Sequence, residues 1–154
     1  MNTPHTPPEQ GAPSEPHRVV WDTRIAVVLR EGLADWQKLN VTAFVASGVA
    51  AAAEGVMGEP YVDGDGVGYL PMLGQPVFVL TADAARMRTI HQRAVRRGVR
   101  AAIYPESVFA TNNDAANRAT ITGVATADLV LAGLAVHGDK REVDKVVKGA
   151  SPHP

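Results

Sequence analysis

A continuous apolar run near the start of the chain most constrains the fold. Ile25, Ala26, Val27, Val28 and Leu29 follow one another without a polar residue. A strand with one face in water alternates apolar and polar side chains, whereas a strand covered on both faces reads as an unbroken apolar run. The run therefore predicts a central strand in a sheet that carries helices on both faces.

Segments that favour strands and helices alternate along the rest of the chain. The further strands are predicted over 77–80, 101–104 and 129–136, and the helices over 36–54, 83–97 and 139–148. Hydrophobic residues make up 45% of the chain and charged residues 20%, which is typical of a globular domain. We therefore expect an α/β fold, a three-layer α/β/α sandwich around a small mixed, mostly parallel sheet.

The faces of the predicted helices follow from the spacing of apolar residues. The first helix is expected to begin at Trp36 with Asp35 as its N-cap, and the second is expected to stop at Gly98. The residues expected to face the sheet are Leu39, Ala43, Ala46, Ala50 and Ala53 in the first helix, Met87, Ile90, Ala94 and Val95 in the second, and Val143, Val146 and Val147 in the third.

The segment 55–74 carries a turn signal. Asp63-Gly64-Asp65-Gly66 lies between short apolar stretches, which predicts a β-hairpin because Asp-Gly pairs tolerate positive φ. A calcium-binding loop is the alternative for these residues. Its later ligand positions fall on Val67 and Gly74, which offer no carboxylate, so the turn is favoured.

The ends of the chain are expected to lie outside the domain. Residues 1–18 contain five prolines and one large apolar side chain, which predicts a disordered proline-rich tail. A single α/β domain is expected over 19–149 and a short C-terminal tail over 150–154. No membrane-spanning run, signal peptide or cysteine is present, so we expect a cytoplasmic protein that does not bind a membrane.

A basic cluster lies in the second predicted helix and just after it. Six arginines occur between Arg86 and Arg100 with no acidic residue among them. Arg93, Arg96 and Arg97 are candidate nucleic-acid-binding residues, because such a surface can neutralise phosphates. The alternative is a solvated helix face whose arginine stems cover apolar surface.

Polar side chains gather after two of the predicted strands. Lys38 follows the first strand and Glu106 follows the third. Ligands in open α/β sheets bind beyond the carboxyl ends of parallel strands, often against helix N-termini. The alternative is that Lys38 is an ordinary surface lysine and does not bind a ligand. The residues expected to bind a substrate there are Asn40, Thr42, Thr111, Asn112, Asn113 and Asp114.

Cofactor and metal motifs are not found. The glycines follow no strand-to-helix fingerprint, and the histidines lack metal-ligand spacing. We therefore expect neither a cofactor nor a metal.

Several segments between Arg24 and Gly149 resemble the bacterial "domain of unknown function 2000" family. They are Trp36-Gln37-Lys38-Leu39-Asn40-Val41, Glu59-Pro60-Tyr61, Tyr69-Leu70-Pro71-Met72, Gln75-Pro76, Val108-Phe109-Ala110-Thr111 and Asp144-Lys145-Val146-Val147-Lys148-Gly149. That family is similar in fold to peptidyl-tRNA hydrolase type II, the archaeal and eukaryotic type. The resemblance implies a compact α/β/α sandwich and a homodimer.

The resemblance also implies roles for two residues. Lys38 falls where the hydrolase has its helix-opening catalytic lysine, and Glu106 matches its acidic residue after the third strand. The chain departs from the hydrolase pattern at Gln37, where the hydrolase has glycine, and at Thr42, where it has glutamine. The histidine that the hydrolase carries in the middle of this helix is absent.

Three functions follow from these observations. The first is binding or hydrolysis of a small acyl-type substrate at the strand ends, with Lys38 and Glu106 as catalytic residues. The second is peptidyl-tRNA hydrolysis itself, in which the arginines of the basic cluster bind the tRNA. The third is a non-catalytic dimeric interaction protein that pairs through its hairpin and the small residues of its first helix.

Overall fold

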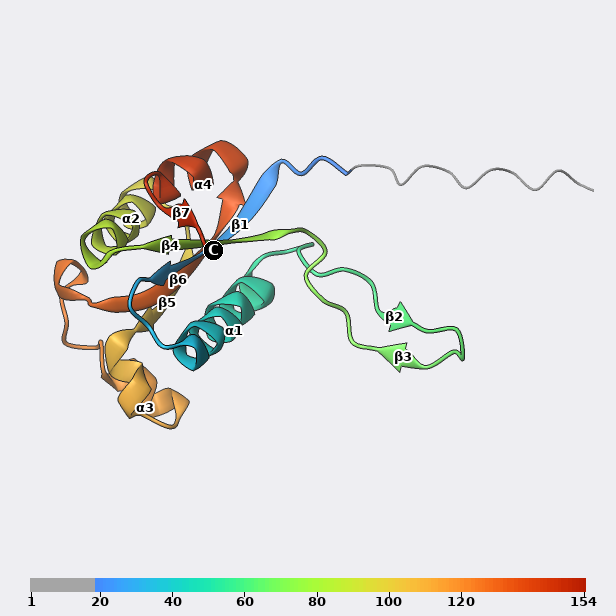
Figure 1. The fold of residues 1–154 in the computed structure, drawn as a ribbon, viewed down its shortest axis with the longest axis horizontal. Helices are drawn as coiled ribbons and strands as arrows, with labels where there is room; N and C mark the ends of the chain where they lie inside the picture. The colour runs from blue at the N-terminus through green and yellow to red at the C-terminus, as the bar shows by residue number, and fades with distance from the viewer. Residues whose placement is uncertain (1–18) are drawn as a thin grey trace, which may run out of the picture.

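A five-stranded sheet forms the centre of the protein in the computed structural model, which describes residues 19–154 (Figure 1). The predicted proline-rich tail, residues 1–18, lies outside the described residues. The strand order is β5-β6-β1-β4-β7. The strands are β1 (Thr23–Arg30), β4 (Val77–Ala82), β5 (Ala101–Pro105), β6 (Leu131–Asp139) and β7 (Ser151–Pro152).

Helices cover both faces of this sheet, as the apolar run of β1 predicts (Figure 1). The α-helices are α1 (Asp35–Ala52), α2 (Ala84–Arg97), α3 (Asp114–Ala119) and α4 (Lys140–Val147), and the 3₁₀ helices are η1 (Glu106–Ala110) and η2 (Thr126–Asp128). α1 packs on one face, and α2 and α4 pack on the other. Every residue from Ile25 to Leu29 is buried, because both layers cover β1.

The expectation of a mostly parallel sheet is wrong. Among the strands of residues 19–154, only β1 and β4 pair in parallel, whereas the β1–β6, β5–β6 and β4–β7 pairs are antiparallel. A parallel connection needs an element that carries the chain back along the sheet. The segment between β5 and β6 holds only short helices, of which α3 has six residues, so the chain turns at one edge and β6 runs back beside β5.

The C-terminal residues take part in the sheet. Ser151 and Pro152, expected in a short tail, form β7 and pair with Thr81 and Leu80 of β4. Proline has no N–H to donate, and an edge strand leaves one side of its backbone unpaired, so Pro152 is tolerated there.

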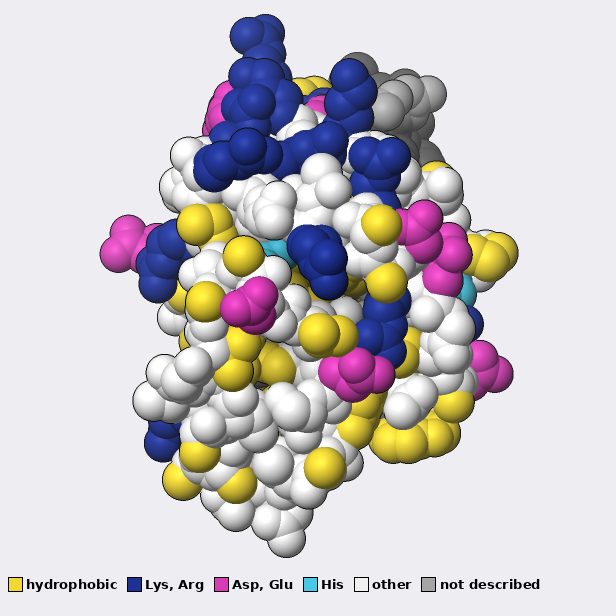
Figure 2. Space-filling view, turned by 90° about the vertical axis from the view of Figure 1, so that its left-hand side faces the viewer, with side chains coloured by type: hydrophobic (Ala, Val, Ile, Leu, Met, Phe, Trp, Pro, Cys, Tyr) yellow, Lys and Arg dark blue, Asp and Glu magenta, His cyan; other side chains and the backbone are white. Residues whose placement is uncertain are grey.

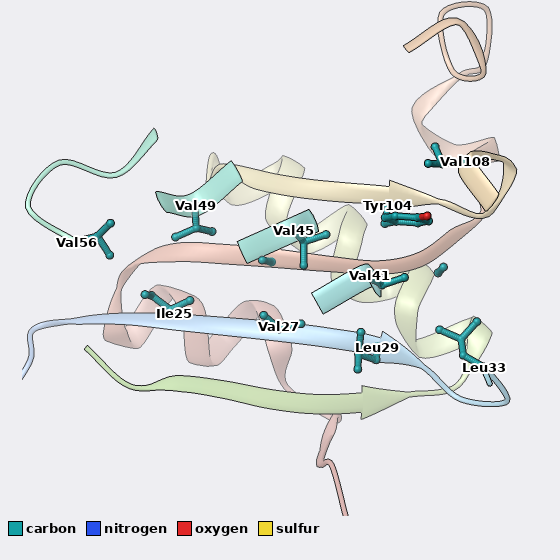
Figure 3. Close-up of a cluster of buried hydrophobic side chains, with 12 residues drawn as sticks. Ile25, Val27, Leu29, Leu33, Val41, Val45, Val49, Val56, Tyr104 and Val108 are labelled. Atoms are coloured by element: carbon teal, nitrogen blue, oxygen red, sulfur yellow. The ribbon is translucent and has the colours of Figure 1, made fainter. Parts of the chain in front are cut away.

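The inward face of α1 differs from the predicted one. Val41, Val45 and Val49 are buried against the sheet, as Figure 3 shows, whereas Leu39 is 73% exposed. The helix is apolar around most of its circumference, so apolar spacing alone does not identify the buried side. The sheet decides which side of α1 is buried, because Gly133 leaves the space that Val41 fills. A Cβ on Gly133 would lie 2.5 Å from Cγ1 of Val41.

The other two long helices agree more closely with their patterns. Met87, Ile90 and Ala94 of α2 are buried as expected, and Val143 and Val146 of α4 are buried too. α2 ends at Gly98, whose φ is 65°. Val95 is exposed instead of buried, and His91 takes an inward position that the apolar spacing missed.

The predicted hairpin is present. β2 (Tyr61–Val62) and β3 (Gly68–Tyr69) pair antiparallel, and the segment 55–74, called the arm below, extends away from the rest of the molecule (Figure 1). No described helix is long and apolar enough to cross a membrane.

Candidate functional site

The carboxyl ends of β1, β4 and β5 lie at one edge of the sheet. β4 runs parallel to β1, and β5 also does, because each of β5 and β1 is antiparallel to β6. α1 follows β1 at this edge, and η1 follows β5. Lys38 and Glu106 therefore lie near the same end of the sheet, as the strand-end argument predicts.

Glu106 is held by an arginine from the central strand. Nη2 of Arg30 lies 2.8 Å from Oε1 of Glu106, and the Arg30 side chain is 18% exposed while that of Glu106 is 52% exposed. The hydrogen bond from Arg30 lowers the pKa of the Glu106 carboxyl, against a smaller opposing effect of burial. Glu106 is therefore a carboxylate at neutral pH, with one oxygen in the ion pair and the other free for a further hydrogen bond.

Lys38 lies in the first turn of α1 and is largely covered. Its side chain is 28% exposed, and Nζ lies 3.9 Å from Oδ1 of the exposed Asp35. Within residues 19–154, Lys38 and Glu106 form no ion pair with each other, since Glu106 pairs with Arg30.

No side chain in the described part of the chain caps the N-terminus of α1. The helix begins at Asp35 with Ala34 as its N-cap, so the prediction of Asp35 as N-cap is wrong. Gln37 instead reaches back, and its Oε1 accepts a hydrogen bond of 2.9 Å from the Ala34 N–H. The first backbone N–H groups of α1 remain available to a ligand, and the helix dipole makes this end favourable for negative charge.

An aromatic chain joins α1 to η1, and sequence reasoning missed it. Trp36 packs edge-on against Phe109 with ring centroids 5.8 Å apart, and Phe109 lies 4.9 Å from Tyr104. Tyr104 contacts Phe44 in turn, at 5.8 Å. The sequence indicated Trp36 and Phe109 only as members of the segments that carry the family resemblance, and not as a contact. These aromatic contacts hold the first turn of α1, which carries Lys38, against η1, which carries Glu106.

The predicted substrate-binding residues divide into two groups, and one of them maintains local structure. The Thr42 hydroxyl donates to the carbonyl of Lys38, 2.8 Å away. Asn113 caps α3 by accepting from the Ala116 N–H at 2.8 Å, and its amide nitrogen donates to Oδ1 of Asn112. Thr111 is hydrogen-bonded to Asn117. Thr42 is thus bonded within α1, whereas Thr111, Asn112 and Asn113 stabilise the segment after β5.

The second group consists of Asn40 and Asp114, which are both exposed. Oδ1 of Asn40 accepts a hydrogen bond of 3.3 Å from the Tyr104 hydroxyl. Asp114, which pairs with Arg118, lines a groove of about 230 Å³ beside Phe44 and Tyr104.

A second groove, of about 400 Å³, is lined by Glu106, Ser107 and Val124, and the two grooves share Pro105 and Ile121. The larger groove lies within the volume range of small-ligand pockets.

The basic residues of α2 form a separate surface. Nη1 of Arg93 donates to the carbonyl of Lys148 at 2.7 Å, and Nη1 of Arg97 donates to Glu142 at 3.1 Å. Both side chains thus tie α2 to α4 and the residues after it, while Arg96 is exposed. Figure 2 shows Lys and Arg side chains gathered at the upper end of one face, away from most of the acidic groups on it.

The fold and the grooves define a class: a layered α/β protein with a mixed sheet and a candidate ligand site at the carboxyl ends of its parallel strands. The chain belongs to the family described as "Protein of unknown function (DUF2000)", whose model matches residues 23–154. A solved structure of a protein of unknown function from Agrobacterium tumefaciens is 44% identical, with a TM-score of 0.85, and the match covers 88% of this chain and 100% of that one. No curated protein matches the chain.

Proposed function

We propose that this protein binds and hydrolyses a small acyl-type substrate in the grooves at the carboxyl end of β5. The observation that carries the proposal is the Arg30–Glu106 pair, a fixed carboxylate beside an open groove. The Trp36–Phe109 contact, which joins the first turn of α1 to the segment that carries Glu106, supports a role for the largely covered Lys38 of that turn.

The residues have complementary roles in this chemistry. The free oxygen of Glu106 accepts a hydrogen bond from a water and orients it toward the acyl carbonyl. Lys38 and the uncapped N–H groups of α1 stabilise the negative charge that develops on the carbonyl oxygen. The water oxygen bonds to the carbonyl carbon, the ester C–O bond breaks, and the proton that the water loses goes to the leaving alcohol oxygen, so the products are a carboxylic acid and an alcohol.

A likeness to peptidyl-tRNA hydrolase type II and a cytoplasmic location are part of the proposal. Lys38 in the first turn of α1 and Glu106 directly after β5 support the likeness, because the resemblance implies the hydrolase's catalytic lysine and acidic residue at these positions. The absence of cysteine fits a reducing compartment.

The test is hydrolysis of N-blocked amino acid esters of short alcohols by the full chain and its variants. Lys38→Ala is expected to lower kcat/KM about 100-fold, the effect of removing one oxyanion donor. Glu106→Gln keeps a hydrogen-bond acceptor for Arg30 but loses the charge, and is expected to lower the rate as well. Lys140→Ala, which removes an exposed lysine at the start of α4, is the matched control.

Two results would overturn the proposal. One is an activity that Lys38→Ala and Glu106→Gln leave at the level of Lys140→Ala, and the other is no hydrolysis of any ester by the unaltered chain.

Peptidyl-tRNA hydrolysis is the second candidate, and the concentration of basic side chains at one end supports it (Figure 2). In that case the N-blocked amino acid is released faster from tRNA than from a short alcohol. Binding then weakens steeply with salt, because phosphate contacts release counterions. Arg96→Ala is expected to reduce the salt dependence, whereas equal rates on both esters and a flat salt response would exclude this candidate.

A further inference from the structure

A small cavity, called the α2 cavity below, lies beside the first half of α2 and has a volume of about 40 Å³. Its basic lining residues are Arg30, at the end of β1, and Arg88 and His91 of α2. The other lining residues are apolar: Ala84, Met87, Leu129, Val130 and Leu131. No acidic side chain of residues 19–154 lines the cavity, so its walls favour a negatively charged occupant.

The spacing of residues along α2 brings its two basic groups to the cavity together. Met87 and Arg88 lie four and three residues before His91, so all three share one side of the helix. Met87 and His91 are buried, whereas Arg88 is exposed at the margin of this side. The helix therefore presents a covered imidazole and an accessible guanidinium to the end of β1.

His91 is a buried polar side chain whose ring has no hydrogen-bond partner in the described part of the chain. It is 6% exposed, and the side-chain hydrogen bonds of α2 involve other residues. No fully enclosed side-chain nitrogen or oxygen among residues 19–154 lacks a partner. The ring nitrogens of His91 therefore reach the open space of the α2 cavity, where a ligand can supply the missing hydrogen bond.

Arg30 and the start of α2 hold further donors at the same place. Nη2 of Arg30 donates to Glu106, which fixes a guanidinium that is 18% exposed and leaves its other N–H groups without a described partner. Asp83 caps α2 by accepting a hydrogen bond of 2.7 Å from the Arg86 N–H. The Ala84 N–H, which lies at the cavity, has no backbone partner within the described residues.

The size and charge of the α2 cavity favour a carboxylate over a phosphate. A water molecule needs roughly 10–15 Å³ of such space, so a cavity of about 40 Å³ has room for the three non-hydrogen atoms of a carboxylate. Burial lowers the pKa of His91, which leaves the ring neutral with one N–H to donate. Because Glu106 offsets the charge of Arg30, the remaining positive charge is that of Arg88, which matches one carboxylate rather than a phosphate dianion.

We propose that the α2 cavity is a binding site for the carboxylate group of a small organic acid. Arg88 and the free N–H groups of Arg30 form charge-assisted hydrogen bonds with the carboxylate oxygens, and the His91 ring donates a third. Met87 and Leu129 contact the short hydrocarbon part of the acid. This inference does not rest on the proposed function, because the binding of an acid requires no ester and no hydrolysis.

The test is a titration of the full chain with sodium acetate, followed by the NMR signals of the His91 ring at constant ionic strength. Acetate is expected to shift these signals saturably and to leave those of His137 unchanged. Acetamide, which has nearly the same shape and no charge, is expected to leave the His91 signals unchanged. Inorganic phosphate at the same ionic strength is expected to bind more weakly than acetate.

A pair of arginine variants locates the acetate. Arg88→Gln is expected to weaken acetate binding about tenfold, the effect of losing one hydrogen bond to a charged group. Arg96→Gln is the matched control, since Arg96 is an exposed arginine of the same helix that does not line the cavity. It is expected to leave the affinity unchanged within about twofold.

Four results would overturn the proposal. Two concern the ligand: His91 signals that acetate does not shift, and shifts that acetamide produces equally. The third is tighter binding of phosphate than of acetate, which would rule out a carboxylate as the preferred group. The fourth is an equal loss of affinity in Arg88→Gln and Arg96→Gln, which would mean that acetate responds to the general charge of α2 and not to this cavity.

Discussion

The central strand and the arm are both rich in apolar residues, yet opposite forces maintain them. In β1, Ile25 to Leu29 are buried between two helical layers, so the removal of apolar surface from water stabilises the strand. In the arm, backbone hydrogen bonds at the base and the Asp63 carboxylate at the tip maintain the shape, while the apolar side chains remain in solvent. Apolar composition therefore predicts burial only where another element of the same chain is within reach.

The largest expected effect separates these two regions by stability. Ile25→Ala removes a fully buried side chain and is expected to lower the free energy of unfolding by about 2–5 kcal/mol. Leu70→Ala is expected to change it by less than about 0.5 kcal/mol in dilute protein, because little is packed on that side chain. Urea denaturation followed by circular dichroism measures both, and equal losses would contradict the comparison.

A glycine in β6, which pairs with the central strand, and a glycine in the arm give a smaller contrast. A Cβ on Gly133 would lie 2.5 Å from Cγ1 of Val41 and 3.1 Å from the Val28 carbonyl oxygen, whereas nothing lies within 4 Å of one on Gly64. Gly133→Ala is therefore expected to cost about 1–3 kcal/mol through overpacking. Gly64→Ala is expected to be neutral in thermal unfolding, and a destabilised Gly64→Ala would show that the arm is packed after all.

The smallest expected effect is a loss of hydrogen-exchange protection at the tip of the arm at low pH. Hydrogen bonds from the Val67 N–H and the Tyr69 hydroxyl lower the pKa of the Asp63 carboxyl. A carboxyl whose folded pKa is depressed stabilises the fold above its unfolded pKa of about 3.9, and this contribution is lost as the pH falls through the folded value. The amides of Asp65 and Val67 should therefore lose hydrogen-exchange protection below about pH 4, while those of β1 keep it.

Two variants control the acid experiment. Asp63→Asn is expected to remove the pH dependence and to leave the tip less protected at neutral pH. Asp65→Asn should leave both unchanged, because its carboxylate accepts none of the hydrogen bonds that order the tip. Protection that is independent of pH in the unaltered chain would mean that the turn does not depend on the Asp63 charge.

The candidate site was predictable in its position but not in its contacts. The order of strands and helices places Lys38 and Glu106 after two strands whose carboxyl ends share an edge, and this holds although most strand pairs are antiparallel. The Arg30–Glu106 pair joins residues 76 positions apart, and the Trp36–Phe109 contact likewise spans distant segments. Neither has a local signal in the sequence, because both depend on how separate elements pack.

Local patterns by themselves determined the buried central strand, the glycine-terminated α2, the hairpin turn and the presence of helices on both faces. Each of these depends on residues a few positions apart, whose periodicity and turn chemistry act within one element. Only the tertiary structure decided the direction of β6, the inward face of α1 and the pairing of β7. These depend on long-range packing: the absence of a long helix between β5 and β6, the space that Gly133 leaves for Val41, and the free edge of β4.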